Sequence, residues 1–163
     1  MPEAPGIELR VTDWASDSQA LIAVRRAVFI REQGIPEKDE WDSADTVATH
    51  VLVRLNRDPV GTGRLEAPGK IGRLAVLGTA RRLGVGSLML RHLVEIARAR
   101  GLDGVYLHAQ AAALDFYGVH GFVAEGPEFD EAGIRHRRMR LAFSAEQRPG
   151  SPTHGSTHRA LDR

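Results

Sequence analysis

The chain has 163 residues, of which 42% are apolar and 26% are charged, and its net charge is +1. This balance is typical of one globular domain of ordinary size, and it gives no reason to expect a nucleic acid or an anionic membrane as a partner. There is no cysteine, which excludes disulfides, thiolate catalysis and cysteine-ligated metals, and we expect no metal at all. No apolar run is long enough to span a membrane, and we expect a cytoplasmic protein.

The first half of the chain predicts one strand, one helix and a three-stranded meander. Residues 7–11 alternate apolar and polar side chains, as a half-buried strand does. The spacing of apolar residues predicts an amphipathic helix over 18–29, with Asp17 as its N-cap. An acidic loop with no more than one short helical turn is expected over 31–45. Three strands joined by tight turns are predicted over 50–55, 59–66 and 71–77.

The second half predicts two helices and three strands. Apolar residues at helical spacing predict a helix over 86–100, ended by Gly101 in the left-handed conformation. A strand over 105–109, a short helix over 111–120 and strands over 122–125 and 135–143 complete the chain. The order β-α-βββ-α-β-α-ββ predicts an α/β fold with a mixed, mostly antiparallel sheet flanked by helices. We expect residues 1–145 to form a single domain and the polar tail 146–163 to be disordered.

A loop with two glycines lies between the strand 71–77 and the helix 86–100. A helix N-terminus offers unpaired N–H groups and a positive partial charge, and Gly84 and Gly86 let a phosphate approach the backbone closely. Arg81 and Arg82 add positive charge. The spacing fits neither the dinucleotide fingerprint, whose third glycine is missing, nor the ATP-binding loop, whose lysine is replaced by Val85. A tight turn without a ligand is the alternative interpretation of the glycines alone.

Two motifs in the same order resemble those of the GNAT superfamily of N-acetyltransferases. The run Arg73-Leu74-Ala75-Val76-x4-Arg81-x-x-Gly84-x-Gly86 resembles the acetyl-CoA signature of the superfamily, and Gln110-x-x-Ala113-x-x-Phe116-Tyr117-x-x-x-Gly121-Phe122 resembles its second motif. The chain is most similar to the ElaA-type subgroup, through Val28-Phe29-x-x-Glu32-Gln33, His50-x-Leu52 and Glu131-x-Gly133-Ile134-x-His136-x-x-Met139. The resemblance covers about residues 7–143 and brings no defined acceptor with it.

The resemblance implies a single-domain, GNAT-like enzyme that moves an acetyl group from acetyl-CoA to a primary amine by direct attack. The cofactor-binding residues that it implies are Leu74, Ala75, Val76, Arg81, Arg82, Leu83, Gly84, Val85, Gly86, Ser87, Gln110 and Phe116. A backbone N–H near Val76 would polarise the acetyl carbonyl. Tyr117 aligns with the general acid that protonates the leaving thiolate, and a packing aromatic is its alternative role.

The acceptor side is less defined. Glu32, Glu40 and Asp42 in the acidic segment are the predicted binding residues for a cationic amine, with a solvated acidic loop as the alternative. Glu66 and His136 are candidate bases, and a structural role is the alternative for His136. We expect a small-molecule or peptide amine as acceptor, and a homodimer is left open.

Arg64 and Arg73 lie within predicted strands, where an arginine side chain can be buried. A buried arginine needs an anionic partner, so we expect both residues to pair with the acidic segment.

Two other functions fit parts of the sequence. Acyl-homoserine-lactone synthases have an early Arg-x-x-x-Phe pattern and an acidic loop with a tryptophan. This chain matches that pattern loosely through Arg25 and Arg26, Phe29, Trp41 and Asp42. The intact phosphate loop argues against that function. A non-catalytic domain that binds acyl-CoA as a sensor is the second alternative, and the presence of Tyr117 argues against it.

Overall fold

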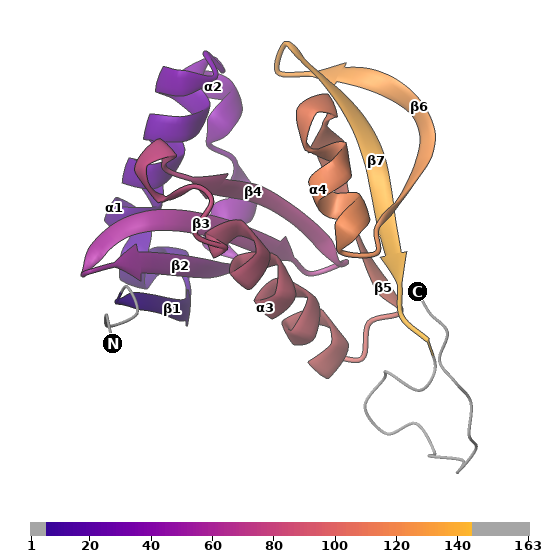
Figure 1. Cartoon of the computed structure of the whole chain (residues 1–163), viewed down its shortest axis with the longest axis horizontal. Coiled ribbons are helices and arrows are strands. Elements are labelled where there is room, and N and C mark those ends of the chain that lie inside the picture. Colours follow the sequence, from indigo (N-terminus) through magenta and orange to yellow (C-terminus); the bar gives the residue numbers. More distant parts are fainter. Residues whose placement is uncertain (1–5, 145–163) are drawn as a thin grey trace. The chain divides into compact units, whose positions relative to one another are not determined.

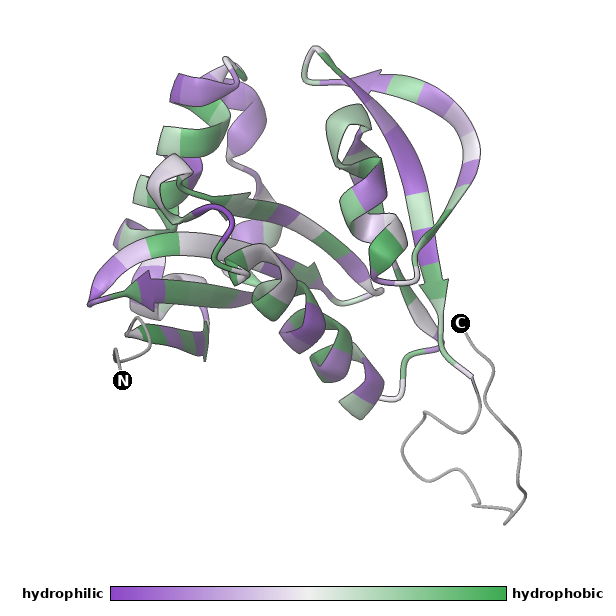
Figure 2. Cartoon of the chain, viewed as in Figure 1, coloured by the Kyte–Doolittle hydropathy of each residue, from purple (hydrophilic) through white to green (hydrophobic). Residues whose placement is uncertain are grey.

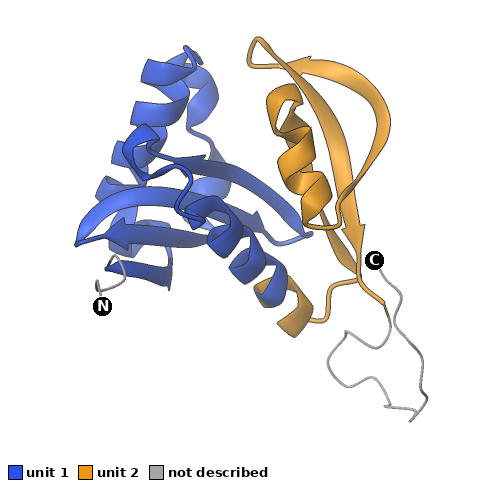
Figure 3. Ribbon diagram, in the orientation of Figure 1, with its two compact units in different colours: residues 1–95 blue, residues 96–163 orange. Residues whose placement is uncertain are grey.

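The structure is a computed structural model that describes residues 6–144 (Figure 1). The chain divides into two compact units between Glu95 and Ile96 (Figure 3). The predicted element order and α/β fold class are confirmed, with short π- and 3₁₀-helical segments in addition. Within the described range, no helix has the length and apolar character needed to cross a bilayer. The predicted disordered tail lies outside the described residues, and the single domain over 1–145 stays a prediction.

Unit 1 contains a four-stranded antiparallel sheet in the order β1-β2-β3-β4. Its strands are β1 (Ile7–Thr12), β2 (Thr49–Leu55), β3 (Asp58–Glu66) and β4 (Lys70–Val76). Strands β2 and β3 are joined by Asn56 and Arg57, whose φ angles of 50° and 78° are those of a tight left-handed hairpin turn. Val51, Leu52 and Leu65 are fully buried and form part of the core.

The first helix, α1 (Trp14–Arg25), begins earlier than predicted. Asp13 is its N-cap, because the Asp13 carboxylate accepts the N–H of Ser16 at 2.8 Å. The prediction that Asp17 caps the helix is therefore wrong. Asp17 lies inside α1 at a kink, with φ −132° and ψ 22°, and its carboxylate accepts the Thr12 hydroxyl at 2.6 Å.

The segment that follows α1 is more regular than the predicted loop. A π-helix, η1 (Arg26–Glu32), continues α1, and α2 (Glu37–Glu40) and a 3₁₀-helix, η2 (Ser43–Thr46), come next. Asp42 caps η2 by accepting the N–H of Ala44 at 3.1 Å. The acidic segment is thus folded into short helical turns whose side chains have fixed directions.

Helix α3 (Val85–Ala99) has the predicted apolar stripe, and Figure 2 shows hydrophobic and hydrophilic residues recurring along it. Two glycines of β3 allow α3 to pack closely on the sheet. A Cβ at Gly61 would lie 2.8 Å from Val85, and a Cβ at Gly63 would lie 3.0 Å from Leu93. Gly61 therefore lets the start of α3 lie close to β3, and Gly63 does the same for the middle of the helix.

Unit 2 contains a three-stranded antiparallel sheet in the order β5-β7-β6. Its strands are β5 (Gly104–Gln110), β6 (Val123–Glu131) and β7 (Ile134–Ala142), and η4 (Ala111–Ala113) and α4 (Leu114–Val119) follow β5. Strand β6 is longer than predicted, because the ladder resumes at Phe129 after an irregularity that begins at Glu125. Glycine and proline in that irregular stretch hid the second part of the strand from its sequence pattern.

Candidate active site

Residues 81–87, the predicted phosphate loop, contain a turn of the kind that binds anions. Arg82 and Gly84 have φ angles of 67° and 80°, so left-handed residues flank Leu83 immediately before α3. Such alternation turns successive N–H groups toward one side. A Cβ at Gly84 would meet no atom within 4 Å, so the space beside its backbone is open. The loop can therefore present N–H groups to an anion at a helix N-terminus.

Strand β4 contains a bulge that includes Leu74, the first of the residues predicted to hold pantetheine. Thr62 pairs with Ala75 and Arg64 pairs with Gly72, so Gly63 alone faces Arg73 and Leu74. Arg73 has a φ of 52°, which is unusual for a residue with a side chain. Bulges of this kind re-aim the backbone that follows them.

The backbone of Val76 faces away from β3. The Leu77 N–H donates to the Val60 carbonyl at 2.8 Å, and successive N–H groups of a strand alternate between its two sides. The Val76 N–H therefore points to the opposite side. The Val76 carbonyl accepts the Nε–H of Arg81 at 3.1 Å, which links this strand end to the phosphate loop.

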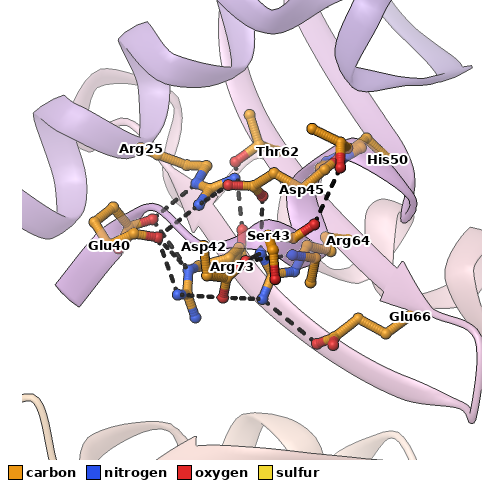
Figure 4. Close-up of polar contacts among 12 residues, drawn as sticks. Arg25, Glu40, Asp42, Ser43, Asp45, His50, Thr62, Arg64, Glu66 and Arg73 are labelled. Atoms are coloured by element: carbon orange, nitrogen blue, oxygen red, sulfur yellow. Dashed lines mark hydrogen bonds and ion pairs between the residues drawn. The ribbon is translucent and has the colours of Figure 1, made fainter. Parts of the chain in front are cut away.

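The acidic segment is held by a buried charge network, which Figure 4 shows. Arg25 is fully buried, and its guanidinium lies 2.7 Å from Glu40 and 2.6 Å from Asp45. Arg64 lies 2.8 Å from both Asp42 and Asp45. The expectation that Arg64 and Arg73 pair with the acidic segment is confirmed, because Arg73 binds Glu40 at 3.2 Å and Asp42 at 3.3 Å.

Burial and charge act differently on two carboxylates of this network. Burial raises the pKa of Glu40 in spite of its arginine partners. Burial also acts to raise the pKa of Asp45, but the hydrogen bonds and charges of Arg25 and Arg64 outweigh it, so that pKa is lowered. Glu40 is only 2% exposed, which favours a structural role over contact with a substrate. Asp42 has a side chain that is 41% exposed and can still meet a ligand.

His50 contacts Asp45 of the same network, and its burial leads us to expect a loss of stability at mildly acidic pH. Its Nε2 lies 2.9 Å from the Asp45 carbonyl, which can only accept, so Nε2 carries the proton. Burial, with the charges of Arg25 and Arg64, lowers the pKa of His50. Below the unfolded-state pKa of about 6.5, the unfolded chain binds a proton that the folded chain excludes. The free energy of unfolding therefore decreases as the pH is lowered, by up to about 1.4 kcal/mol per pH unit.

Urea titrations between about pH 7 and pH 5.5 measure this slope. The His50→Gln variant keeps a neutral donor and should lose most of the slope. The exposed His92 is the matched control, and His92→Gln should keep it. An unchanged slope in His50→Gln would assign the acid sensitivity to other groups.

Unit 2 holds the remaining predicted site residues. Tyr117 lies in α4 with its ring edge-on to Phe116 at 5.1 Å and to Phe122 at 5.9 Å. Burial alone raises the pKa of Tyr117 to about 12, so the phenol stays protonated at neutral pH. Gln110 is the last residue of β5. The structure thus gathers residues 74–76 and 81–87 in unit 1, and Gln110, Phe116 and Tyr117 in unit 2.

The candidate bases have protein partners. Glu66 lies 3.4 Å from Arg64. His136 is 6% exposed, and its Nδ1 lies 2.7 Å from the Ile134 carbonyl, which favours the structural alternative. No group of three or more His, Asp or Glu side chains within residues 6–144 is arranged to hold a metal ion.

Two members of the charge network were missed by the sequence reasoning. These are Arg25 and Asp45, whose side chains are only 0% and 3% exposed. Arg25 stands four residues after the buried Leu21 and three before the buried Val28, so helical spacing places it on the core face. That position could have identified Arg25 from the sequence, because an arginine on the core face of a helix needs an anionic partner.

The sequence profile of the family described as "Acetyltransferase (GNAT) domain" matches residues 28–143. The chain belongs to the GNAT acetyltransferase family. It is therefore an enzyme of the acyltransferase class, and this membership favours an N-acetyltransferase over the acyl-homoserine-lactone synthase alternative.

Relatives in sequence and structure agree with the GNAT assignment. A Bacillus subtilis protein named Uncharacterized N-acetyltransferase YjcF is 38% identical over 71% of this chain and 86% of its own length. Protein ElaA of Escherichia coli is 32% identical over 76% of this chain and 86% of its own length, which confirms the resemblance to the ElaA type. The crystal structure of Escherichia coli ElaA matches with a TM-score of 0.73 over 83% of this chain and 99% of that one, at 28% identity.

Two further solved structures share the GNAT fold. An acyl-CoA N-acyltransferase from Pseudomonas aeruginosa matches with a TM-score of 0.76 over 84% of this chain and all of that one, at 31% identity. PaiA N-acetyltransferase from Thermoplasma acidophilum, solved in complex with coenzyme A, matches with a TM-score of 0.66 over 85% of this chain and 99% of that one. At 18% identity the PaiA likeness concerns the fold alone.

Proposed function

We propose that this protein transfers the acetyl group of acetyl-CoA to a primary amine of a small molecule or peptide. The observation that carries the proposal is the left-handed turn at Arg82 and Gly84, which leads directly into α3 in a chain of the GNAT family. A helix N-terminus preceded by such a turn suits a pyrophosphate. The PaiA relative of the same fold was solved with coenzyme A.

The proposed reaction uses few groups of the protein. The backbone of residues 74–76 holds the pantetheine arm, and the backbone of residues 81–87 holds the pyrophosphate, with Gln110 and Phe116 as further contacts. The Val76 N–H donates to the acetyl oxygen, where negative charge develops. The amine nitrogen bonds to the acetyl carbon and passes a proton to water as the carbon–sulfur bond breaks. Tyr117 donates its proton to the departing thiolate.

The proposed acceptor carries positive charge. Glu32 and Asp42 are partly exposed carboxylates of the segment predicted to face the acceptor, with side chains 47% and 41% exposed. We leave Glu40 out of this set because of its burial. Calorimetric titration with acetyl-CoA, followed by thiol release with a panel of amines, tests the function. Binding without thiol release for any amine would favour the sensor alternative.

Changing Tyr117 to phenylalanine tests the acid. We expect kcat to fall about 10²-fold, a typical contribution of general acid catalysis, while the Kd of acetyl-CoA changes little, because only the hydroxyl is lost. The chain has only one other tyrosine, so Tyr106→Phe is the matched control and should leave kcat unchanged. Normal turnover of Tyr117→Phe would leave Tyr117 with the packing role.

A further inference from the structure

An ion pair joins the predicted phosphate loop to the acidic segment. Glu32 and Arg81 stand 49 positions apart in sequence, yet Arg81 Nη1 lies 2.7 Å from Glu32 Oε2 and Nη2 lies 2.6 Å from Oε1. The contact is bidentate, which is the strongest geometry for an arginine and a carboxylate. Both side chains are nearly half exposed, at 43% for Arg81 and 47% for Glu32. The pair is therefore within reach of a ligand.

The π-helix η1 explains how Glu32 comes to face Arg81. Glu32 is the last residue of η1, and the Gln33 N–H bonds to the Val28 carbonyl at 3.0 Å, five residues back. The extra residue in that turn rotates the following side chains by about 100° relative to an α-helix. Wide turns of this kind are uncommon and are frequently found at functional sites. The backbone distortion thus aims a carboxylate at the phosphate loop.

The charge on Arg81 bears directly on the affinity for an anion. A guanidinium that already holds a carboxylate in bidentate geometry has two of its N–H groups occupied and part of its charge balanced, so it attracts a phosphate less strongly. The hydrogen bond and charge of Arg81 lower the pKa of Glu32, so Glu32 is ionised at neutral pH. An anion that arrives at the loop therefore competes with Glu32 for Arg81.

We propose that Glu32 is an internal competitor of the cofactor pyrophosphate for Arg81, so that Glu32 sets the affinity for the donor. This inference rests on the proposed function of the loop. Glu32 is a positioning residue here, because it acts on the donor through Arg81. When the donor binds, its pyrophosphate replaces Glu32 as the anion that contacts Arg81. The Glu32 carboxylate then has no arginine partner, and it lies on the segment predicted to face the acceptor.

Changing Glu32 to glutamine should tighten donor binding. An exposed ion pair is weak, so its removal should lower the Kd for acetyl-CoA about twofold to fivefold, as measured by calorimetric titration. The KM for acetyl-CoA should fall by a similar factor while kcat does not rise. The matched control is Glu125→Gln, because Glu125 pairs with Arg138 at 2.8 Å with exposures of 45% and 40% and does not touch the phosphate loop. Glu125→Gln should bind acetyl-CoA as the wild type does.

A double-mutant cycle tests whether the effect passes through Arg81. In an Arg81→Gln background there is no guanidinium to compete for, so Glu32→Gln should no longer change the Kd. A purely structural role for the ion pair would weaken donor binding in Glu32→Gln instead of tightening it. An unchanged or weaker affinity in Glu32→Gln, in a wild type that binds acetyl-CoA, overturns the competition and leaves the proposed function standing. A wild type that binds no acetyl-CoA overturns both.

Discussion

Replacing Gly84 with aspartate should abolish the binding of acetyl-CoA. The residue has a φ of 80°, and its side-chain direction is open, so the aspartate would stand where the pyrophosphate is proposed to lie. Two like charges about 4 Å apart near a protein surface repel by about 4 kcal/mol, and we therefore expect at least about a 100-fold increase in Kd. Calorimetry and the shift of Tm with acetyl-CoA both measure this change.

Two further variants separate charge from backbone strain. Gly84→Ala carries the strain of a left-handed residue without the charge, and it should weaken binding far less than the aspartate. Gly133 has a φ of 79° and the same open surroundings in the β6–β7 turn, so Gly133→Asp should bind acetyl-CoA normally. If acetyl-CoA raised the Tm of Gly84→Asp as much as that of the wild type, the phosphate would have to bind elsewhere.

Replacing Arg25 with methionine should cause the largest loss of stability. Methionine fills much of the space of the arginine side chain. It removes the guanidinium, whose nitrogens lie 2.7 Å from the Glu40 carboxylate and 2.6 Å from the Asp45 carboxylate. Breaking a buried ion pair from one side typically costs 3–5 kcal/mol, and we expect about 3 kcal/mol because Arg73 and Arg64 remain as partners. The guanidinium also lies 5.5 Å from the Trp14 ring centre and 5.0 Å from that of Trp41, and these contacts would be lost as well. Urea unfolding measures the change.

Charge counting supplies the rescue experiment. Arg25, Arg64 and Arg73 pair with four carboxylates, Glu40, Asp42, Asp45 and Glu66, so Arg25→Met leaves two positive charges against four negative ones. Adding Asp45→Asn removes one negative charge that has lost its partner and should recover part of the lost stability. The exposed Arg135 pairs with Glu128 and Asp130, and Arg135→Met should cost less than about 1 kcal/mol. Equal losses for Arg25→Met and Arg135→Met would show that the buried network contributes little.

Local patterns predicted the elements well. The apolar stripe of α3, its glycine end at Gly101 and the alternation in β1 are each properties of consecutive residues, and the structure confirms the first two. In β1 the alternation of burial holds from Ile7 to Arg10 and ends at Val11, which is 50% exposed. The start of α1 was misplaced because Asp13 and Asp17 are equally suitable caps by residue type. The choice between them depends on contacts such as the one from Asp17 to Thr12, which the helix pattern does not contain.

Long-range contacts were predicted only in part. An arginine inside a strand pattern needs an anionic partner, which was enough to link Arg64 and Arg73 to the acidic segment. The link between Glu32 and Arg81 could not be predicted, because it depends on a π-helical turn whose sequence gives no recognisable signal. The roles of Tyr117 and of the phosphate loop stay predictions, carried by motif resemblance and by local geometry.

The bulge in β4 has a consequence for redesign of the acidic segment. Arg73 stands at this bulge, and its guanidinium donates to the Glu40 carbonyl at 3.0 and 3.2 Å, so the acidic segment is anchored by its main chain as well as by side chains. A segment grafted from a relative would therefore have to present a carbonyl at the same point, whatever its sequence. A single substitution at the exposed Val47, just after this segment, avoids that constraint and offers a more tractable starting point for redesign.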